Sequence, residues 1–381
     1  MNGNGALSSQ LIKQISNLGQ ITSCDKALTS AVIQPASADL TVGDWGYCVK
    51  STFLPKANEK IEDAVKRYQL YPVNISKGYV LNKGITYVFK LNEKLKLSKD
   101  IFAYTSSKSS TGRINLWVRT LADNTARFDR IPAGYKGNLY IMVTPKSWPI
   151  ILKSGESLNQ IRFFNSETKL SNFELKLLDQ EIGLLFDKNG KQIPTNGHID
   201  SDGLLLTVDL EQDIVAYEAR GSVNILDLSK RCYYEMEDFF RPIYRSRESE
   251  LILEQGSFYL LSTYEQIRVP ADYSVEMIAY DIASGEFRSH YAGFFDPGFG
   301  YGKNGEIKGR SGVLEIFPHE NVILRHRQPV CKMVYERMIV HPDKVYGESN
   351  LGSHYHAQTG PQPSKHFKYH KNKVIYKNNK K

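Results

Sequence analysis

The chain has 381 residues, of which 41% are hydrophobic and 24% are charged, and this globular composition excludes intrinsically disordered, collagen-like and coiled-coil proteins. The formal net charge is +8, but residues 365–381 hold seven lysines and no acidic residue, so we expect a solvated basic tail and no nucleic-acid partner. No apolar run approaches the roughly 20 residues of a membrane span, and a signal-peptide pattern is absent. A soluble, cytoplasmic protein without membrane contact is therefore predicted.

The expected elements, in chain order, are mostly short strands. Residues 8–19 predict an amphipathic helix, because apolar side chains recur on one face and a glycine follows. Further helices are expected near residues 58–68 and 236–240. Runs of Val, Ile, Leu, Tyr and Phe between turn residues predict strands at residues 79–81, 86–90, 139–144, 204–210, 258–262 and 313–317. This pattern is typical of a mostly β protein with few helices, built as a barrel or a sandwich.

A weak internal repeat divides the chain. The apolar–turn–apolar segment around Gly84 resembles the segment around Gly256, 172 positions later, and residues 97–100 match residues 269–272 at the same offset. Two matches at one offset favour a duplicated β domain over chance similarity. We assign the following domains: residues 1–170, an N-terminal domain; 171–345, a C-terminal domain; and 346–381, a C-terminal segment with a basic tail.

The cysteines and histidines do not have the spacing of a metal site. The four cysteines form no CxxC pair, which favours reduced thiols over a disulfide framework or a zinc site: Cys24, Cys48, Cys232 and Cys331. Zinc deaminases carry H-x-E followed by P-C-x-x-C, and the chain lacks this pattern, so we expect no zinc and no protein-bound metal. Four late histidines are irregularly spaced, which favours a solvated tail over a metal tract: His354, His356, His366 and His370.

Residues 106–113, Ser-Ser-Lys-Ser-Ser-Thr-Gly-Arg, are a candidate phosphate-binding loop. Hydroxyl and backbone N–H groups donate to phosphate oxygens, while Lys108 and Arg113 would neutralise the phosphate charge. The composition of the segment also fits a solvated turn, and this alternative stays open.

Two carboxylates of the second half are candidates for acid–base chemistry. Glu315 interrupts an apolar strand, so it is either exposed at an edge or buried with its pKa shifted towards neutrality. Asp296 precedes a proline in a glycine-rich turn between aromatic residues, where aspartate is also a common turn residue. From the residues alone, a catalytic and a structural role remain open for each carboxylate.

Five short segments follow one another in a recognisable order. They are residues 33–40 (IQPASADL) with Gly43, 109–113 (SSTGR), 296–299 (DPGF), 313–315 (VLE), and 355–361 (YHAQTGP) with Ser364 and Lys365. Together they resemble the dCTP deaminases of the trimeric dUTPase-like superfamily, in the long two-domain form found in some bacteria. The resemblance implies two tandem dUTPase-like domains, each a distorted, jelly-roll-like β-barrel, in a homo-oligomer for which a trimer is favoured.

The resemblance also implies roles for residues at matching positions. Glu315 would be the general base, with Arg113 and Ser109 steadying the attacking water and the developing charge. Lys108 and Ser110 would grip the phosphates. The turn that reads the base would comprise Asp296, Gly298 and Phe299. The late segment would close over bound nucleotide through Tyr355, Gln358, Ser364 and Lys365.

Each half departs from the family pattern in a different place. The first half has Pro132-Ala-Gly134 where Asp-Pro-Gly is expected, and Met142 where the glutamate is expected. The second half keeps both acidic residues but places Asp281 in its phosphate-loop position, and it is longer near residues 300–312. Because these defects are complementary, we predict one competent site type per chain, which combines the phosphate loop of the first domain with the base-reading turn of the second.

The predicted function is hydrolytic deamination of dCTP to dUTP and ammonia, a step towards dUMP for thymidylate synthesis. Mg²⁺ is expected on the triphosphate of the substrate. The expected ligands are dCTP and, in addition, dUTP or dTTP. Two alternatives stay open: a bifunctional enzyme that also cleaves dUTP to dUMP, since Asp296 stands where dUTPases have an aspartate-centred turn, and a non-catalytic nucleotide-binding regulator.

Overall fold

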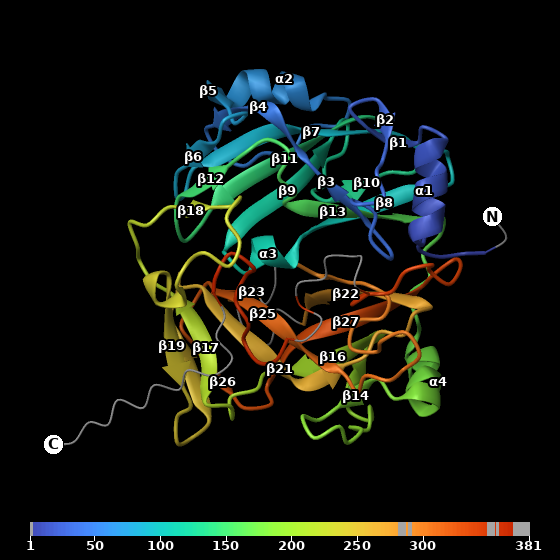
Figure 1. Cartoon of the computed structure of the whole chain (residues 1–381), viewed down its shortest axis with the longest axis vertical. Helices are drawn as coiled ribbons and strands as arrows, with labels where there is room; N and C mark the ends of the chain where they lie inside the picture. Colours follow the sequence, from blue (N-terminus) through green and yellow to red (C-terminus); the bar gives the residue numbers. More distant parts are fainter. Residues whose placement is uncertain (1–2, 281–286, 289–291, 349–354, 356–357, 369–381) are drawn as a thin grey trace.

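The computed structural model describes residues 3–280, 287–288, 292–348, 355 and 358–368. Figure 1 shows two stacked halves, the upper one formed by the first part of the sequence and the lower one by the second part. Both halves consist mainly of antiparallel sheets with a few short helices. The predicted mostly β architecture is therefore confirmed.

The N-terminal half is built from two main sheets. The larger sheet runs, in spatial order, through β2 (Lys26–Ala27), β1 (Ile21–Ser23), β7 (Thr86–Lys96), β11 (Lys136–Pro145) and β9 (Leu116–Ala122), and β7 also pairs with β4 (Val42–Val49), which pairs with β5 (Gln69–Asn74). The second sheet comprises β10 (Arg130–Ile131), β8 (Phe102–Ser107), β13 (Asn159–Phe164) and β3 (Ala38–Leu40). A small third sheet comprises β18 (Leu226–Asp227), β12 (Ile150–Leu152) and β6 (Tyr79–Leu81).

The C-terminal half also has two main sheets. The first comprises β19 (Phe240–Tyr244), β17 (Ile214–Ala219), β21 (Tyr259–Ile267), β25 (Arg310–Pro318) and β23 (Phe287–Arg288), with β14 (Leu185–Phe186) paired to β21. The second comprises β15 (Ile199–Asp200), β16 (Gly203–Thr207), β27 (Pro329–Arg337), β22 (Tyr273–Ala279) and β24 (Phe294–Phe295). A separate ribbon pairs β20 (Glu250–Leu253) with β26 (Val322–Arg325).

The two halves repeat the same strand order. The series β4-β7-β11-β9 corresponds to β17-β21-β25-β23, and β10-β8-β13-β3 corresponds to β24-β22-β27-β16. The repeat extends to buried polar contacts, since Glu93 accepts from the Thr41 backbone N–H at 2.8 Å and Glu265 accepts from that of Thr207 at 2.8 Å. The two glutamates are 172 positions apart, the offset of the sequence repeat, and this agreement supports a duplicated domain.

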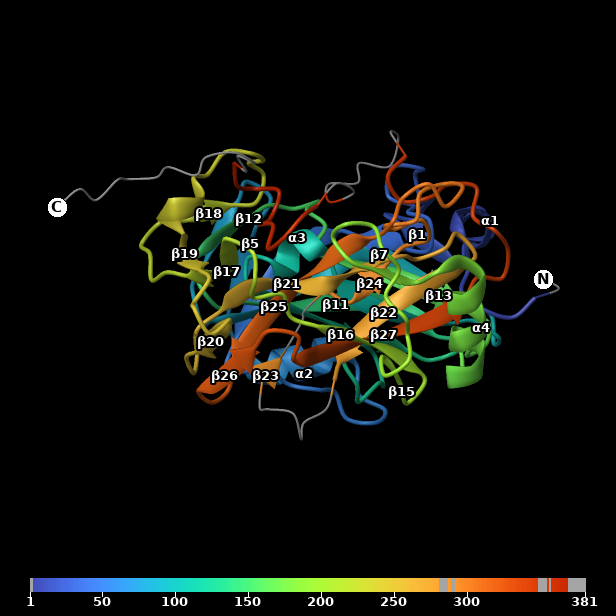
Figure 2. The same ribbon diagram turned by 90° about the horizontal axis from the view of Figure 1, so that it is seen from below.

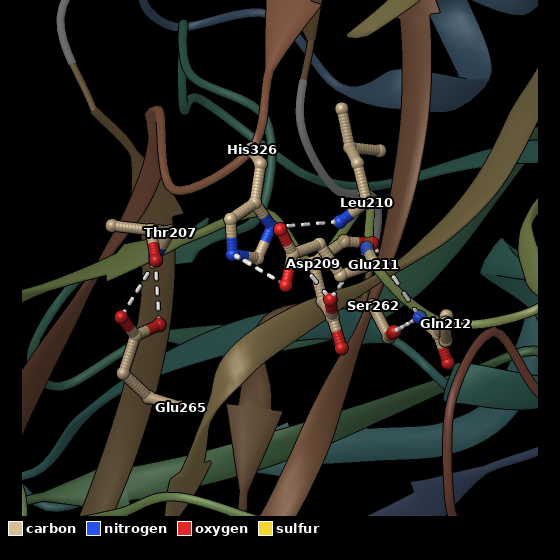
Figure 3. Close-up of polar contacts among 8 residues, drawn as sticks. All are labelled: Thr207, Asp209, Leu210, Glu211, Gln212, Ser262, Glu265 and His326. Carbon is tan, nitrogen blue, oxygen red and sulfur yellow. Dashed lines mark hydrogen bonds and ion pairs between the residues drawn. The ribbon is translucent and has the colours of Figure 1, made fainter. Parts of the chain in front are cut away.

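Figure 3 shows the contact between Thr207 and Glu265 at the end of β16. The sequence predicted that this strand continues to residue 210. It ends at Thr207 instead, because the chain turns at Asp209. The Asp209 carboxylate accepts from the Glu211 backbone N–H at 3.0 Å, and His326 Nδ1 accepts from that of Leu210 at 3.1 Å. Other predicted strands are present but longer; β7 continues to Lys96 and β21 to Ile267.

The predicted helices at residues 8–19 and 58–68 are present as α1 (Ser9–Asn17) and α2 (Ile61–Tyr68). The helix expected near residues 236–240 is only a single 3₁₀ turn, η1 (Met236–Asp238), because β19 begins at Phe240. Among the helices described, none combines the length and apolar character that crossing a membrane requires.

The sequence analysis missed the helix that begins the C-terminal half. Helix α4 (Asn172–Ile182) begins with a capping box, in which Ser171 and Glu174 bond reciprocally to each other's backbone N–H groups, and this Ser-x-x-Glu spacing is readable in the sequence. Both views place α1 and α4 on the same side of the molecule, one on each half (Figures 1 and 2).

The core of the N-terminal half continues into the C-terminal half. Its large apolar cluster includes Phe240, Leu260 and Val313 from the second half of the sequence, whereas a second large cluster fills the C-terminal half. Buried polar contacts cross the same junction. The fully buried Arg162 of β13 donates to the carbonyl oxygens of Val275 and Phe295 at 3.2 Å each. The two halves are therefore packed together by both apolar and hydrogen-bonded contacts.

Candidate active site

A cavity of about 280 Å³ lies at the junction of the two halves. Its N-terminal lining comes from β3, from β13 and from the segment that follows β8, and its C-terminal lining comes mainly from β24, β25 and the turn after β24. Of the predicted site residues, ten line this cavity: Lys108, Ser109, Ser110, Arg113, Asp296, Phe299, Glu315, Tyr355, Gln358 and Lys365. A single chain therefore brings together residues that are up to 257 positions apart.

The candidate phosphate loop contains one turn of helix, α3 (Ser109–Gly112). Lys108 is extended and caps this turn, since its carbonyl oxygen accepts from the Gly112 backbone N–H at 3.0 Å. The Lys108 ammonium forms an ion pair with Asp39 of β3. Helix α3 lies at the junction of the two halves (Figure 1), so the loop is part of a structured site rather than a solvated turn.

Glu315 lies inside the protein, not at a sheet edge. Its strand β25 lies between β21 and β23, Leu260 is its partner on β21, and only 1% of the residue is exposed. The Glu315 carboxylate accepts from the Ala292 backbone N–H at 3.0 Å. Of the two placements left open by the sequence, the structure therefore has the buried one.

The Glu315 carboxylate lies against the backbone of α3 in the other half. A Cβ atom added at Gly112 would be 2.3 Å from one carboxylate oxygen and 2.5 Å from the other, distances that real Cβ atoms do not reach. Only glycine leaves room for this approach. Gly112 is therefore the residue that lets the candidate base meet the candidate phosphate loop.

Arg113 follows α3 and is held by the end of the chain. Its Nη2 donates to Gln358 Oε1 at 2.7 Å and its Nη1 to the Gln362 carbonyl oxygen at 3.1 Å. The guanidinium carbon lies 3.8 Å from the centre of the Tyr355 ring, a cation–π contact. Burial lowers the pKa of Arg113, while the neighbouring Tyr355 and Glu315 oppose that shift. The contacts fix the guanidinium at the wall of the cavity.

The described part of the closing segment, residues 355 and 358–368, covers α3. Ser364 Oγ donates to the Ser110 carbonyl oxygen at 2.8 Å, and the Lys365 backbone N–H donates to the Tyr355 hydroxyl at 3.0 Å. Gln358 Nε2 donates to the Ser311 carbonyl oxygen at the start of β25. The closing segment thus contacts both halves, and Ser364 contacts the candidate phosphate loop.

Cationic side chains gather at one end of the cavity. Lys108, Arg231 and Lys365 all line it. Burial, together with the positive charges of Arg231 and Lys108, lowers the pKa of Lys365 to about 8. Nearby, burial raises the pKa of Glu156, although Lys365 and Arg231 oppose the shift. This end of the cavity suits an anionic group.

The base-reading turn predicted from the sequence is anchored by a buried arginine. Asp296 lies 3.5 Å from Arg162 Nη2; burial raises the pKa of Asp296, and Arg162 opposes this shift. Phe299 lines the cavity, whereas Gly298 lies behind it with φ +93°, where a Cβ atom would come within 2.8 Å of Val345. The glycine therefore shapes the turn without lining the cavity.

The remaining predictions fall in different places. Met142 packs in an apolar cluster with Val88 and Tyr140. Within the part of the chain that the structure describes, no group of three or more His, Cys, Asp or Glu side chains could hold a metal ion, and His366 Nδ1 lies 2.9 Å from the Lys230 carbonyl oxygen. The predictions for four residues lie outside the described residues: Asp281, His354, His356 and His370.

The sequence analysis assigned no role to the other ten lining residues, among them Gln34, Asp39, Arg231 and Tyr346. Asp39 and Gln34 belong to the 33–40 segment quoted for the resemblance, so a signal for them was present. Arg231 and Tyr346 stand in no motif, and only the tertiary structure brings them to the cavity.

Comparison with known proteins identifies the family. Residues 3–167 match the N-terminal domain and residues 171–367 the C-terminal domain of 2'-deoxycytidine 5'-triphosphate deaminase (DCD). The crystal structure of 2'-deoxycytidine 5'-triphosphate deaminase from Agrobacterium tumefaciens is 35% identical, covers 92% of this chain and 100% of its own, and superposes with a TM-score of 0.83.

Shorter relatives match over about a third of the chain. A protein of Methanosphaera stadtmanae named "dCTP deaminase, dUMP-forming" is 31% identical over 141 residues, which are 34% of this chain and 64% of that protein. A protein of the same name from Methanothermobacter thermautotrophicus is 31% identical over 128 residues, 33% of this chain and 61% of that protein. The matches thus cover less than two thirds of either relative. From the two domain matches and the full-length structural match, the chain belongs to the dCTP deaminase family of hydrolases, in its two-domain form.

Proposed function

We propose that the protein converts dCTP and water to dUTP and ammonia in the cavity between its two halves. The observation that carries this proposal is the buried Glu315 of the C-terminal half, which lies against Gly112 of the N-terminal half beside a cluster of cations. A buried carboxylate next to an anion-binding end matches what deamination of a nucleoside triphosphate requires.

Glu315 acts as the general base. It takes a proton from water as the water oxygen bonds to C4 of cytosine, and it passes protons to N3 and to the leaving amino group, so that ammonia departs and uracil forms. Ser109 and Arg113, on the same wall of the cavity, orient the water and stabilise the charge that develops. The hydrogen bonds of Arg113 to Gln358 and Gln362 hold its guanidinium in place during this step.

The base and the phosphates occupy opposite ends of the cavity. Asp296 and Phe299 contact the nucleoside, with Gly298 shaping their turn, whereas Lys108, Ser110 and Lys365 bind the phosphates. Tyr355, Gln358 and Ser364 close the site, which keeps bulk solvent away from the base and the attacking water.

Mg²⁺ enters the site with the triphosphate. The ion keeps water and phosphate oxygens as most of its ligands. Asp39 Oδ1, which has no hydrogen-bond partner among the described residues, is an oxygen of the kind that a hydrated Mg²⁺ ion binds, so the lining fits such a complex. The ion neutralises phosphate charge.

Further cleavage of dUTP to dUMP is a second candidate function. It is favoured by the name "dCTP deaminase, dUMP-forming" of the shorter relatives and by the position of Asp296 in the cavity lining. A non-catalytic regulator that binds dCTP, dUTP or dTTP is the third reading.

The products formed from dCTP distinguish these functions. Purified protein is incubated with dCTP and Mg²⁺, and dUTP, dUMP, pyrophosphate and ammonia are followed over time. Ammonia with dUTP establishes the deaminase, whereas ammonia with dUMP and pyrophosphate establishes the bifunctional enzyme. Intact dCTP that still raises the melting temperature establishes the regulator and refutes the role of Glu315.

The proposal extends to assembly and location. We expect a cytoplasmic homo-oligomer, with a trimer favoured, as the resemblance to the trimeric dUTPase-like superfamily implies. Light scattering coupled to size-exclusion chromatography measures the mass; a monomer at micromolar concentration would contradict this expectation.

A further inference from the structure

Residues 220–239, which connect β17 to β19, form a crossing segment between the two halves. Its strand β18 pairs in parallel with β12 of the N-terminal half, and Trp148 Nε1 donates to the Arg220 carbonyl oxygen at 2.8 Å. In Figure 1 the crossing segment rises along the left side of the molecule from the lower half to β12. The equivalent connection in the N-terminal half, between β4 and β5, carries α2 instead. The duplicated domains therefore differ here.

The crossing segment also holds the closing segment. The Cys232 backbone N–H donates to the Lys365 carbonyl oxygen at 2.9 Å, and the Lys368 backbone N–H donates to that of Tyr234 at 2.8 Å. The side chain of Phe367 is 2% exposed and packs on Phe239 with ring centres 5.4 Å apart. The two segments thus run side by side up to the cavity.

This pairing places two cations next to each other. Arg231 directly precedes Cys232, the residue of the crossing segment that is hydrogen-bonded to Lys365. Arg231 is exposed to solvent and lines the cavity together with Lys365. Lys108 lines the same end, but its ammonium is already paired with Asp39. Arg231 and Lys365 repel each other, as the lowered pKa of Lys365 indicates. Like charges gathered at an open cavity are stabilised when an anion binds between them.

We propose that Arg231 binds the phosphate chain of the nucleotide and is a third cation of this site, supplied by the crossing segment. The inference rests on the proposed function for the identity of the nucleotide. Three parts of the chain then contribute one cation each: Lys108 comes from the loop before α3, Lys365 from the closing segment and Arg231 from the crossing segment. A triphosphate offers enough oxygens for all three, and the planar guanidinium can bind two of them at once.

The same backbone pairing ties phosphate binding to closure. Because Cys232 and Lys365 are joined by a hydrogen bond, an anion held by Arg231 also stabilises the docked closing segment, which in turn holds Arg113 through Gln358. Arg231 is thus a binding residue outside the reacting centre, and its contact with the anion is coupled to the docked position of the closing segment.

The test compares Arg231→Gln with Lys230→Gln. Lys230 is the adjacent cation, but its ammonium lies 4.2 Å from the centre of the Tyr233 ring, so it serves as the matched control. We expect Arg231→Gln to raise KM for dCTP about 10- to 100-fold, the loss of one charge-assisted contact, with kcat nearly unchanged. Arg231→Lys should recover part of the affinity, and Lys230→Gln should leave KM unchanged.

A second measurement separates this inference from the proposed function. Inorganic tripolyphosphate, which has no base to deaminate, is titrated into the wild-type protein and both variants by calorimetry. Weaker binding by Arg231→Gln alone supports the inference even if dCTP is never deaminated. Equal binding by all three proteins, or equal losses in the two variants, would overturn it even if the wild type is an active deaminase.

Discussion

The carboxylate of Glu315 in the C-terminal half lies against Gly112 of the N-terminal half. The carboxylate is buried, and it accepts a hydrogen bond from Ala292. A glutamate in such a position is oriented by the backbone rather than by solvent. Both partners of this contact can be tested by single substitutions.

Glu315→Gln should abolish ammonia release while leaving dCTP binding largely intact. The amide has nearly the shape of the carboxylate but cannot take a proton from water, so we expect kcat to fall about 10²- to 10⁴-fold. Ammonia release measures the first effect, and calorimetric titration with dCTP measures the second. Loss of binding together with activity would contradict the assignment of Glu315 as the base.

Gly112→Ala should impair catalysis solely by displacing the carboxylate of Glu315. The added methyl group would meet both carboxylate oxygens of Glu315, so the base must move, and a displacement of about 1 Å lowers rates about 100-fold. The matched control is Gly221→Ala, where an added Cβ meets nothing within 4 Å among the described atoms. If both variants keep full activity, the Gly112–Glu315 approach does not matter for the reaction.

The titration of Lys365 should be visible in the pH profile. Its pKa of about 8 means that the ammonium is charged below this pH and neutral above it. Phosphate binding therefore weakens as the pH rises, and kcat/KM for dCTP should fall through about pH 8. Lys365→Arg keeps its charge throughout and should remove this fall; an unchanged profile in this variant would refute the assignment.

At the scale of secondary-structure elements, each half contains a buried glutamate that accepts hydrogen bonds from a threonine on a neighbouring part of the chain. In the C-terminal half, Glu265 of β21 accepts from both the backbone N–H and the hydroxyl of Thr207 (Figure 3). In the N-terminal half, Glu93 of β7 does the same with Thr41. Burial raises the pKa of both carboxyl groups, and their hydrogen bonds with the threonines oppose the shift.

Glu265→Ala should destabilise the fold without touching the cavity. The substitution leaves the Thr207 N–H buried without its acceptor, which costs about 1–3 kcal/mol of unfolding free energy. Glu250→Ala is the control, because the Glu250–Arg325 ion pair is exposed and is expected to contribute about 0–1 kcal/mol. Chemical denaturation measures both, and equal losses would contradict the inference.

The sequence predicted some elements better than others. The helix at residues 8–19 has a strong apolar periodicity and is present, with ends one or two residues inside the prediction. Helix α4 was missed because its apolar face is weak in the sequence, although its Ser-x-x-Glu cap was readable. The turn α3 was not separable from a solvated loop, because four residues are too few for a periodic pattern.

At the scale of the whole molecule, one chain supplies both walls of the cavity. Arg113 comes from the N-terminal half and Glu315 from the C-terminal half, and both line the same cavity. A composite site of this kind can form within one chain or between neighbouring chains. The contact of Glu315 with Gly112 is made within one chain.

Mixed oligomers should therefore show no complementation. Chains with Arg113→Ala and chains with Glu315→Gln are co-expressed with different affinity tags, and oligomers that carry both tags are purified. Because each cavity draws both residues from one chain, every site keeps a defect, and activity should not exceed that of the two variants measured separately. A clear gain in the mixed oligomers would mean that neighbouring chains complete the sites.

Local residue order was enough to predict the strand-rich architecture, the repeat at an offset of 172 residues and the segments that we propose to bind phosphate and base. Tertiary structure alone decided that Glu315 is buried rather than exposed, that Gly112 makes room for it, and that Arg231 reaches the cavity. These facts depend on which surfaces of two packed domains meet, and packing brings together residues that share no local pattern. For the same reason Arg162, an ordinary strand residue in the sequence, became the buried cation beside Asp296 only once the second half had packed against the first.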